Sequence, residues 1–363
     1  MSGERARRRS IEVALALLAA VVVFDLAVLA WGESPRRIAL LLAQGTWGTW
    51  YGAGQVLFKA TSIMIAAVAA RVALRVGLFN IGVEGAIAVS SLAVGAIGAT
   101  LPSTVSPWLA WPLLGAVGAI AGALWTLPAG ILRVRYGAHE VISGIMLNRI
   151  AALLVGFLLK RGLAAQASVH TRPLPAGATL TRLDRVLPAL HGSAANLALL
   201  VALALVVAWP YLARRTVAGR TALAVGASKS AAEAAGVRVG GALLASLALS
   251  GAICGLAPLN DVLGYKGYAE EGLGLAAGFT GLAAALLAGE STLGLLLASL
   301  LFATLAQGGL SINAHVPMEL VDVLVAVAIL FVASARGVVA RLDRRASAPP
   351  AAAEPGGEAR GAR

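Results

Sequence analysis

Charged residues are scarce in this sequence. Asp, Glu, Lys and Arg together make up 13% of the 363 residues, whereas an ordinary soluble domain carries about 25%. Apolar residues make up 59%, and the mean hydropathy is +0.85. A chain of this composition cannot cover a water-facing surface. We therefore expect lipid to be its solvent, and the composition excludes an ordinary soluble protein.

Cysteine and the usual catalytic motifs are also missing. Cys254 is the single cysteine and lies in an apolar run, so no internal disulfide can form and a small buried residue is expected there. The four histidines are scattered, with no His-Glu-x-x-His pair, which argues against a metal site. Neither a Gly-x-x-x-x-Gly-Lys-Ser/Thr phosphate loop nor a Gly-x-Ser-x-Gly elbow occurs. The sequence predicts no enzyme, no metal site and no cofactor of its own.

Acidic residues are fewer than basic ones, which gives a net charge of +12. A basic surface can bind nucleic acid, but here the basic residues stand in short clusters between apolar runs. That placement is typical of the loops that orient a membrane protein. We therefore expect a lipid bilayer as partner, and no nucleic acid.

Apolar runs long enough to cross a bilayer, which takes ~17–25 residues, recur along the chain. The first, 11–31, is long for the apolar core of a signal peptide, so a retained helix is expected. Segment 36–54 is less apolar and aromatic, which suits an interfacial or re-entrant piece. Further spans are predicted at 55–74, 84–101, 108–132, 141–159, 193–213, 241–262, 272–288, 292–309 and 318–335. The sequence thus predicts an all-α polytopic membrane protein with about ten transmembrane helices.

The distribution of Lys and Arg predicts the orientation of these helices. Basic residues are more frequent in the segments that an inside N-terminus places in the cytoplasm, so both termini are expected there. The predicted parts are a basic cytoplasmic N-terminus, a transmembrane domain with an external loop and a cytoplasmic loop, and a disordered cytoplasmic tail rich in Ala, Pro and Gly. The N-terminus is 1–10, the transmembrane domain 11–335 and the tail 336–363. Within the transmembrane domain, the external loop is 162–192 and the cytoplasmic loop is 214–240.

Polar groups at membrane depth are costly and usually face a cavity. Three polar clusters in the sequence are therefore candidates for a functional site. The first, 77–85, contains Phe79, Asn80 and Glu84 between glycines that interrupt a helix. Such a break can line a cavity. It can equally be a cytoplasmic turn, with Glu84 in the first turn of the next helix, where the helix dipole favours an acid.

The second cluster contains Glu140, Ser143, Asn148 and Arg149. Glu140 and Ser143 stand near a predicted helix start, so capping alone can explain them. Asn148 and Arg149 lie about two turns further in, where an arginine costs ~2.5–3.5 kcal/mol unless it is paired or solvated. Both are expected to face a cavity or another helix; the alternative is snorkelling to the membrane surface or a misplaced helix boundary.

The third cluster, 265–272, includes Glu271 and leads to Phe279 in 278–281. It is either an external gate that meets substrate or a solvated loop. In the cytoplasmic segment 219–237, Ser228 or Ser230 can cap a short helix over 231–235 that ends at Gly236. This short helix suits a lever for a soluble motor, and a plain surface helix is the alternative.

Together these motifs resemble the permease family of nucleoside and simple-sugar ABC importers, related to the ribose and branched-chain amino acid permeases, from about residue 55 to 335. The segment 77–85, Gly-Leu-Phe-Asn-Ile-Gly-Val-Glu-Gly, carries the most specific resemblance, and 140–148, 224–237 and 278–283 carry the rest. The sequence departs from the family pattern at Ala86, His139, Leu223, Glu233 and Thr280. These departures affect the substrate and the coupling to the ATPase rather than the fold.

The resemblance implies a multi-pass subunit of a bacterial inner membrane that works with separate ABC ATPase subunits, a second permease subunit, identical or different, and an external solute-binding protein. ATP would be bound by the partners. The implied substrate pathway comprises Phe79, Asn80, Glu84, Glu140, Ser143, Asn148, Glu271 and Phe279. The implied ATPase-contacting loop comprises Gly219, Val225, Gly226, Ser230, Ala231, Ala232, Glu233 and Gly236.

Two other classes of protein remain open from the sequence. A secondary transporter driven by protons or Na⁺ would need no ATPase, and Asp25, Glu84 and Asp322 are the acids that could carry protons. A membrane scaffold that moves nothing is the other alternative.

Overall fold

The computed structural model describes residues 18–19, 21–274, 276–317, 319–320, 323 and 326–327. The described residues form helices and three isolated β-bridges, with no strand among them. Six of the described helices are long and apolar enough to cross a membrane. The predicted all-α membrane class is therefore confirmed. The predicted terminal parts, 1–10 and 336–363, and most of the spans 11–31 and 318–335 lie outside the described residues.

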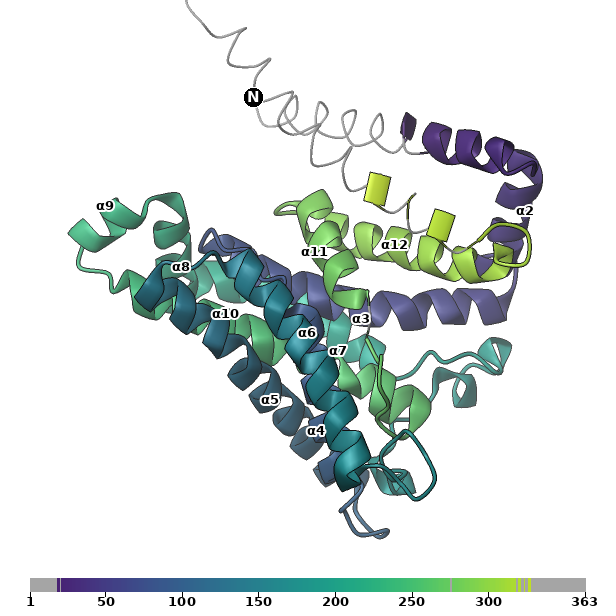
Figure 1. Ribbon diagram of the computed structural model, residues 1–363, viewed down its shortest axis with the longest axis horizontal. Helices are drawn as coiled ribbons and strands as arrows, with labels where there is room; N and C mark the ends of the chain where they lie inside the picture. The colour runs from purple at the N-terminus through teal and green to yellow at the C-terminus, as the bar shows by residue number, and fades with distance from the viewer. Residues whose placement is uncertain are drawn as a thin grey trace, which may run out of the picture.

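The helices follow one another with short connections, except for one long loop between α6 and α7 (Figure 1). A helical stretch at Val21–Ala30 precedes them. The α-helices are α2 (Pro35–Thr46), α3 (Trp50–Arg75), α4 (Val83–Gly98), α5 (Pro107–Tyr136), α6 (Glu140–Leu158), α7 (Ala198–Arg215), α8 (Val217–Ala227), α9 (Lys229–Ala234), α10 (Val239–Cys254), α11 (Ala277–Ala288) and α12 (Thr292–Ile312). Two π-helical segments, η1 (Leu159–Leu163) and η5 (Leu259–Lys266), follow α6 and α10, and three 3-10 turns lie in the long loop: η2 (Ala176–Ala178), η3 (Leu183–Arg185) and η4 (Pro188–Leu190).

Helix α3 is the centre of the bundle and contacts α7, α10, α11 and α12 (Figure 1). Its middle, from Ala60 to Ala73, is an unbroken run of buried residues, most of them Ala, Ile and Val. A helix that is apolar on every side is stable only inside a bundle. The hydroxyl of Thr49 caps its start by accepting a hydrogen bond from the Gly52 amide at 3.0 Å.

Helix α5 packs along α10 through facing glycines. Gly118 lies against the backbone of Gly255, and Gly122 lies against the backbone of Gly251, so closely that a side chain at any of these positions would collide. The hydroxyl of Thr126 adds a hydrogen bond to the Leu247 carbonyl at 2.9 Å. In lipid, where no hydrophobic effect drives helices together, such close backbone contact stabilises the pair.

Several predicted boundaries were wrong at their edges. The span 272–288 begins only at Ala277, because Gly272, Gly274 and Ala276 have positive φ, which a right-handed helix cannot accommodate. The span 241–262 is α-helical only to Cys254 and continues as the π-helical η5. The segment 36–54 divides into α2 and the first turn of α3.

The bundle has two ends that the contacts define. The end that carries α8 and α9 is called the α8 end. At the opposite end, the loop 162–192 is held against the chain after α10, where the amides of Leu174 and Leu180 donate to the carbonyls of Gly267 and Leu263 at 2.7 and 2.9 Å. The long loop is therefore an ordered part of the fold.

Candidate functional site

The motif 77–85 forms the tight turn between α3 and α4. Gly77 has φ +76°, a left-handed conformation that ends α3 at no steric cost. Glu84 stands in the first turn of α4. The motif therefore forms a turn, with Glu84 at a helix start.

Two asparagines fix this turn against neighbouring helices. Asn148, on α6, donates to the Ile81 carbonyl and accepts from the Gly85 amide, both at 2.9 Å. Asn80 donates to the Ser250 hydroxyl at 2.8 Å, and Ser250 in turn donates to a backbone carbonyl of α3. The side chains of Asn80 and Asn148 therefore hold the turn to α10 and α6.

Glu140 is buried at the start of α6 and forms an ion pair. Its carboxylate lies 3.4 Å from Nε of Arg133, and its other oxygen accepts a hydrogen bond from the Phe79 amide at 3.4 Å. The neighbouring Ser143 donates to the His139 carbonyl at 3.4 Å, within the same helix start. Glu140 and Ser143 thus organise the first turn of α6 and its contact with the motif turn.

The other four predicted pathway residues have exposed or partly exposed side chains. Phe79 is 42% exposed and Phe279 is 51% exposed. Glu84 packs against Gly278, the residue before Phe279, so closely that a methyl group on Gly278 would lie 2.6 Å from its Cγ. The structure thus places the start of α4 against the start of α11.

Glu271 lies against α6. A methyl group on Gly156 would lie 3.3 Å from both of its carboxylate oxygens. Glu271 therefore lies beside Gly156 of α6, in the segment 267–276 between η5 and α11. The four exposed or partly exposed members of the predicted pathway lie in the turn before α4, on α4, in this segment and on α11.

A buried polar cluster around Asp261 was missed at the level of sequence. Ser62 on α3 donates to Asp261 at 3.1 Å, and Asn260 donates to Ser62 at 2.9 Å. Asn196 donates to the Asn260 side chain at 3.0 Å. All four side chains are buried. Gly274 lies near the second carboxylate oxygen of Asp261: a methyl group added to Gly274 would lie 3.9 Å from that oxygen.

The signal for this cluster was an Asn-Asp pair at the end of the predicted span 241–262. An acid inside a membrane span is by default a functional hypothesis. Its partners could not be found, because Ser62 is 199 residues away in the sequence. The π-helical geometry of η5 is itself frequent at functional sites.

The predicted ATPase-contacting loop forms α8 and α9. Thr216 caps α8 by accepting from the Gly219 amide at 3.1 Å, and Ser228 caps α9 by accepting from the Ala231 amide at 3.3 Å. Gly236 has φ +81° and follows the end of α9. The predicted short helix is confirmed, and it begins at Lys229, two residues earlier than expected.

The eight residues predicted to contact the ATPase fall into a buried set and an exposed set. Gly219 and Val225 on α8 and Ala232 on α9 are buried, whereas the remaining five are exposed: Gly226, Ser230, Ala231, Glu233 and Gly236. Helix α9 projects at the α8 end of the bundle (Figure 1). Its outer face is therefore available to another protein.

Arg75, the last residue of α3, fastens α8 to the bundle. Its guanidinium donates to the carbonyls of Gly219 and Ala213, each at 3.1 Å, and lies 4.0 Å from the carboxylate of Glu290 in the turn between α11 and α12. Gly226 packs directly on the Arg75 carbonyl. One side chain thus joins α3, the joint between α7 and α8, and the turn before α12.

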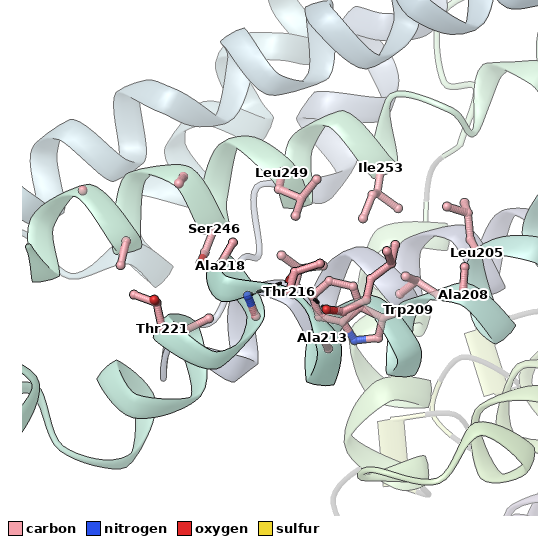
Figure 2. A pocket seen from close by; sticks show the side chains of 18 of the residues that line it. Leu205, Ala208, Trp209, Ala213, Thr216, Ala218, Thr221, Ser246, Leu249 and Ile253 are labelled. Carbon is pink, nitrogen blue, oxygen red and sulfur yellow. Dashed lines mark hydrogen bonds between the residues drawn. The ribbon is translucent and has the colours of Figure 1, made fainter. Parts of the chain in front are cut away.

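A crevice of about 740 Å³ opens between α7 and α10, with α3 as its floor and α8 closing one end. Figure 2 shows Leu249 and Ile253 of α10 above Trp209 and Leu205 of α7, with Thr216 at the α8 end. Its wall is mainly apolar. A second hollow, of about 710 Å³, lies at the opposite end and is polar, between the long loop and the end of η5.

Comparison with known proteins shows similarity over nearly the whole chain. Residues 52–333 match the family described as "Branched-chain amino acid transport system / permease component". A guanosine ABC transporter permease protein of Bacillus subtilis, NupP, is 32% identical over 340 residues, which cover 91% of this chain and 96% of that protein.

Two further relatives have similar coverage. A nucleoside ABC transporter permease protein of Lactococcus lactis, NupB, is 30% identical over 310 residues, 84% of this chain and 83% of its own length. A glucose ABC transporter permease protein of Haloferax volcanii, TsgB13, is 30% identical over 363 residues, 95% of this chain and 94% of its own length. No solved structure matches the chain.

Proposed function

The chain belongs to the permease family of ATP-binding-cassette (ABC) transporters, and we propose that it forms the solute path of an importer for a nucleoside or a simple sugar. It is a multi-pass component of the cell membrane. Proteins of this family work with ATPase subunits and solute-binding proteins. The cargo is proposed from the relatives, whose names specify guanosine, nucleosides and glucose.

The attachment of α8 and α9 to α3 is the structural observation that carries this proposal. An importer without its own nucleotide site needs a surface on which a separate ATPase can push. The exposed face of α9, with Ser230 and Glu233, provides that surface, and Arg75 joins α8 to the central helix. The α8 end is then the cytoplasmic end, and we propose about ten spans with both termini on that side.

The partners are proposed in more detail as follows. ATPase subunits bind the nucleotide, so this chain needs no cofactor and hydrolyses no ATP. A second permease subunit, a copy of this chain or a different chain, completes the path. The solute-binding protein delivers cargo to the opposite end, where the long loop and η5 form the polar hollow.

The solute path is proposed to follow the exposed side chains of Phe79, Glu271 and Phe279 and the partly exposed side chain of Glu84. Nucleosides and sugars present several hydroxyl groups, and carboxylates accept hydrogen bonds from them. An aromatic ring provides an apolar face for a base or a sugar ring. Asn80, Asn148, Glu140 and Ser143 act in this path by fixing the turn and the start of α6.

Asp261 extends the proposed path toward the opposite end. It is buried next to Gly274 in the segment that carries Glu271. A buried carboxylate in a membrane protein is retained at a cost in solvation, which favours a role in function. A small displacement of the glycine-rich segment 267–276 would open one of its oxygens to a solute.

The class of transporter is tested by uptake into proteoliposomes. The complex that copurifies with the tagged chain is reconstituted with ATP inside or outside, and uptake of radiolabelled guanosine and glucose is measured. ATP-dependent uptake that an ionophore leaves unchanged is expected. Uptake that persists without ATP and collapses with the ionophore would instead support an ion-driven secondary transporter, and the absence of any uptake would support a scaffold.

A further inference from the structure

The crevice between α7 and α10 shares no lining residue with the proposed solute path. Its floor is formed by Val68 and Val72 of α3, its sides by α7 and α10, and its closed end by α8. The proposed path follows side chains of the turn before α4, of α4, of the segment 267–276 and of α11. The crevice is therefore a separate feature that needs its own explanation.

The wall of the crevice is apolar except near α8. Leu205, Trp209, Leu249 and Ile253 line its deep part (Figure 2). The hydroxyl of Thr216 is engaged, because it donates to the Leu212 carbonyl at 2.7 Å and accepts from Gly219. A solute rich in hydroxyl groups would lose its hydrogen bonds to water here without finding enough replacements.

Two polar side chains at the α8 end are without partners. Arg238, at the start of α10, is exposed, and Thr221 lies on α8; both side chains line the crevice. Neither side chain forms a hydrogen bond or an ion pair with another residue in the part of the chain that the structure describes. A guanidinium at one end of an apolar crevice is complementary to a ligand with an apolar body and an anionic head.

The length of the crevice fits an acyl chain. Its lining residues run along α10 from Arg238 to Ile253, roughly 22 Å at 1.5 Å per residue. The hydrocarbon of one leaflet is ~15 Å thick, so the crevice is long enough for one acyl chain and its head group.

We propose that the crevice binds an acyl chain of an anionic phospholipid, with the phosphate of the head group held by Arg238 and Thr221. The chain enters from the leaflet at the α8 end and packs between α7 and α10 against Trp209. Binding requires only that the protein lie in a membrane. A bound lipid in this crevice would also set how freely α8 moves against α7 and α10. This consequence rests on the proposed function of α8.

Lipid retention by the detergent-purified protein tests the binding. Native mass spectrometry is used after incubation with phosphatidylglycerol or phosphatidylcholine. Arg238→Gln should lower retention of phosphatidylglycerol roughly fivefold, the effect of one basic residue on an anionic lipid, and leave phosphatidylcholine unchanged. Ala245→Trp, which fills the crevice, should lower retention of both lipids. Arg135→Gln, an exposed arginine of α5 outside the crevice, is the matched control and should change neither.

A second measurement identifies the occupant without relying on the variants. A photoreactive benzophenone amino acid at position 249, inside the crevice, is activated in native membranes. Crosslinks to phospholipid are expected. Crosslinks to a second protein chain or to labelled nucleoside, or equal lipid retention by the wild type and both crevice variants, would overturn the proposal. Neither measurement depends on transport. The proposed lipid site can therefore be rejected while the proposed transport function holds, and the transport function can be rejected while the lipid site holds.

Discussion

The guanidinium of Arg75, at the end of the central helix α3, donates a hydrogen bond of 3.1 Å to the carbonyl oxygen of Gly219 on α8. A second hydrogen bond reaches the Ala213 carbonyl at the end of α7. Ala213 lies in the last turn of α7, where carbonyls lack intrahelical partners, and Gly219 lies in the first turn of α8. One partly buried cation thus bonds to both sides of the α7–α8 joint. Motion of α8 must therefore pull on α3.

Replacing Arg75 should separate ATP hydrolysis from transport. Each hydrogen bond from a charged donor is worth ~1.5–3 kcal/mol, so Arg75→Ala should loosen α8 and lower solute uptake at least about tenfold. ATP hydrolysis by the assembled complex should fall much less, so that more ATP is used per solute. The measurement is the ratio of uptake to hydrolysis in proteoliposomes.

Arg220→Gln provides the control for Arg75. Arg220 is an exposed arginine of α8 whose side chain, among the residues that the structure describes, bonds only to the nearby Arg215 carbonyl, at 3.2 Å. Its replacement should leave the ratio unchanged. If Arg75→Ala lowers uptake and hydrolysis in equal proportion, the side chain serves assembly and not transmission.

Asn148 should act through stability rather than through solute affinity. Asn148→Ala leaves the Ile81 carbonyl and the Gly85 amide without their partner, which costs ~1–3 kcal/mol for a buried group. The thermal midpoint of the purified protein should fall, while the KM of the remaining uptake stays close to that of the wild type. A changed KM at unchanged stability would place Asn148 in direct contact with the solute.

Glu271 is expected to behave in the opposite way. Its carboxylate is exposed beside α6, so Glu271→Gln should leave thermal stability unchanged and raise the KM for uptake several-fold, about 1 kcal/mol for one weakened hydrogen bond. Glu270→Gln is the neighbouring control, because Glu270 is already paired with Lys266 at 3.0 Å. Equal KM values for the two variants and the wild type would remove Glu271 from the proposed path.

Asp261 gives a test of the buried cluster. Asp261→Asn retains an oxygen that can accept from Ser62 and Asn260, so the complex should assemble normally. Uptake should nevertheless fall by about tenfold or more, because a charged acceptor binds a hydroxyl more strongly than a neutral amide. Normal uptake by Asp261→Asn would show that the cluster only holds α3 to η5.

The sequence was sufficient to predict features that depend on neighbouring residues. Helix α3 follows from its apolar run, and α9 follows from Ser228 and Gly236, whose capping roles need only local geometry. The motif 77–85 was correctly recognised as an interruption between two helices. What holds this turn in place could not be predicted, because Asn148 is 63 residues from the Gly85 amide that it binds.

The features that the sequence could not predict depend on contacts between distant segments. The cluster of Ser62 and Asp261 and the Arg75 joint both connect helices whose adjacency is a property of the bundle. The start of α11 was placed too early, because the conformations of Gly272 and Gly274 cannot be distinguished from helix by hydropathy. Hydropathy detects how apolar a segment is, not the backbone angles of its glycines.

The facing glycines of α5 and α10 illustrate the same limit, and they give the last prediction. The sequence showed Gly-x-x-x-Gly pairs at 118 and 122 and at 251 and 255, but not that these two pairs meet. Gly251→Ala places a methyl group onto the Gly122 carbonyl and the Thr126 hydroxyl. Such overpacking costs ~1–3 kcal/mol, which should lower the thermal midpoint and the yield of assembled complex.

Gly241→Ala separates this contact from the general effect of a glycine replacement on α10. A methyl group on Gly241 meets only the Arg238 Cβ, at 4.0 Å, and alanine favours a helix by up to about 1 kcal/mol over glycine. The thermal midpoint should therefore stay the same or rise. If Gly251→Ala is equally well tolerated, the backbones of α5 and α10 can move apart without loss, and close glycine contact does not stabilise this pair of helices.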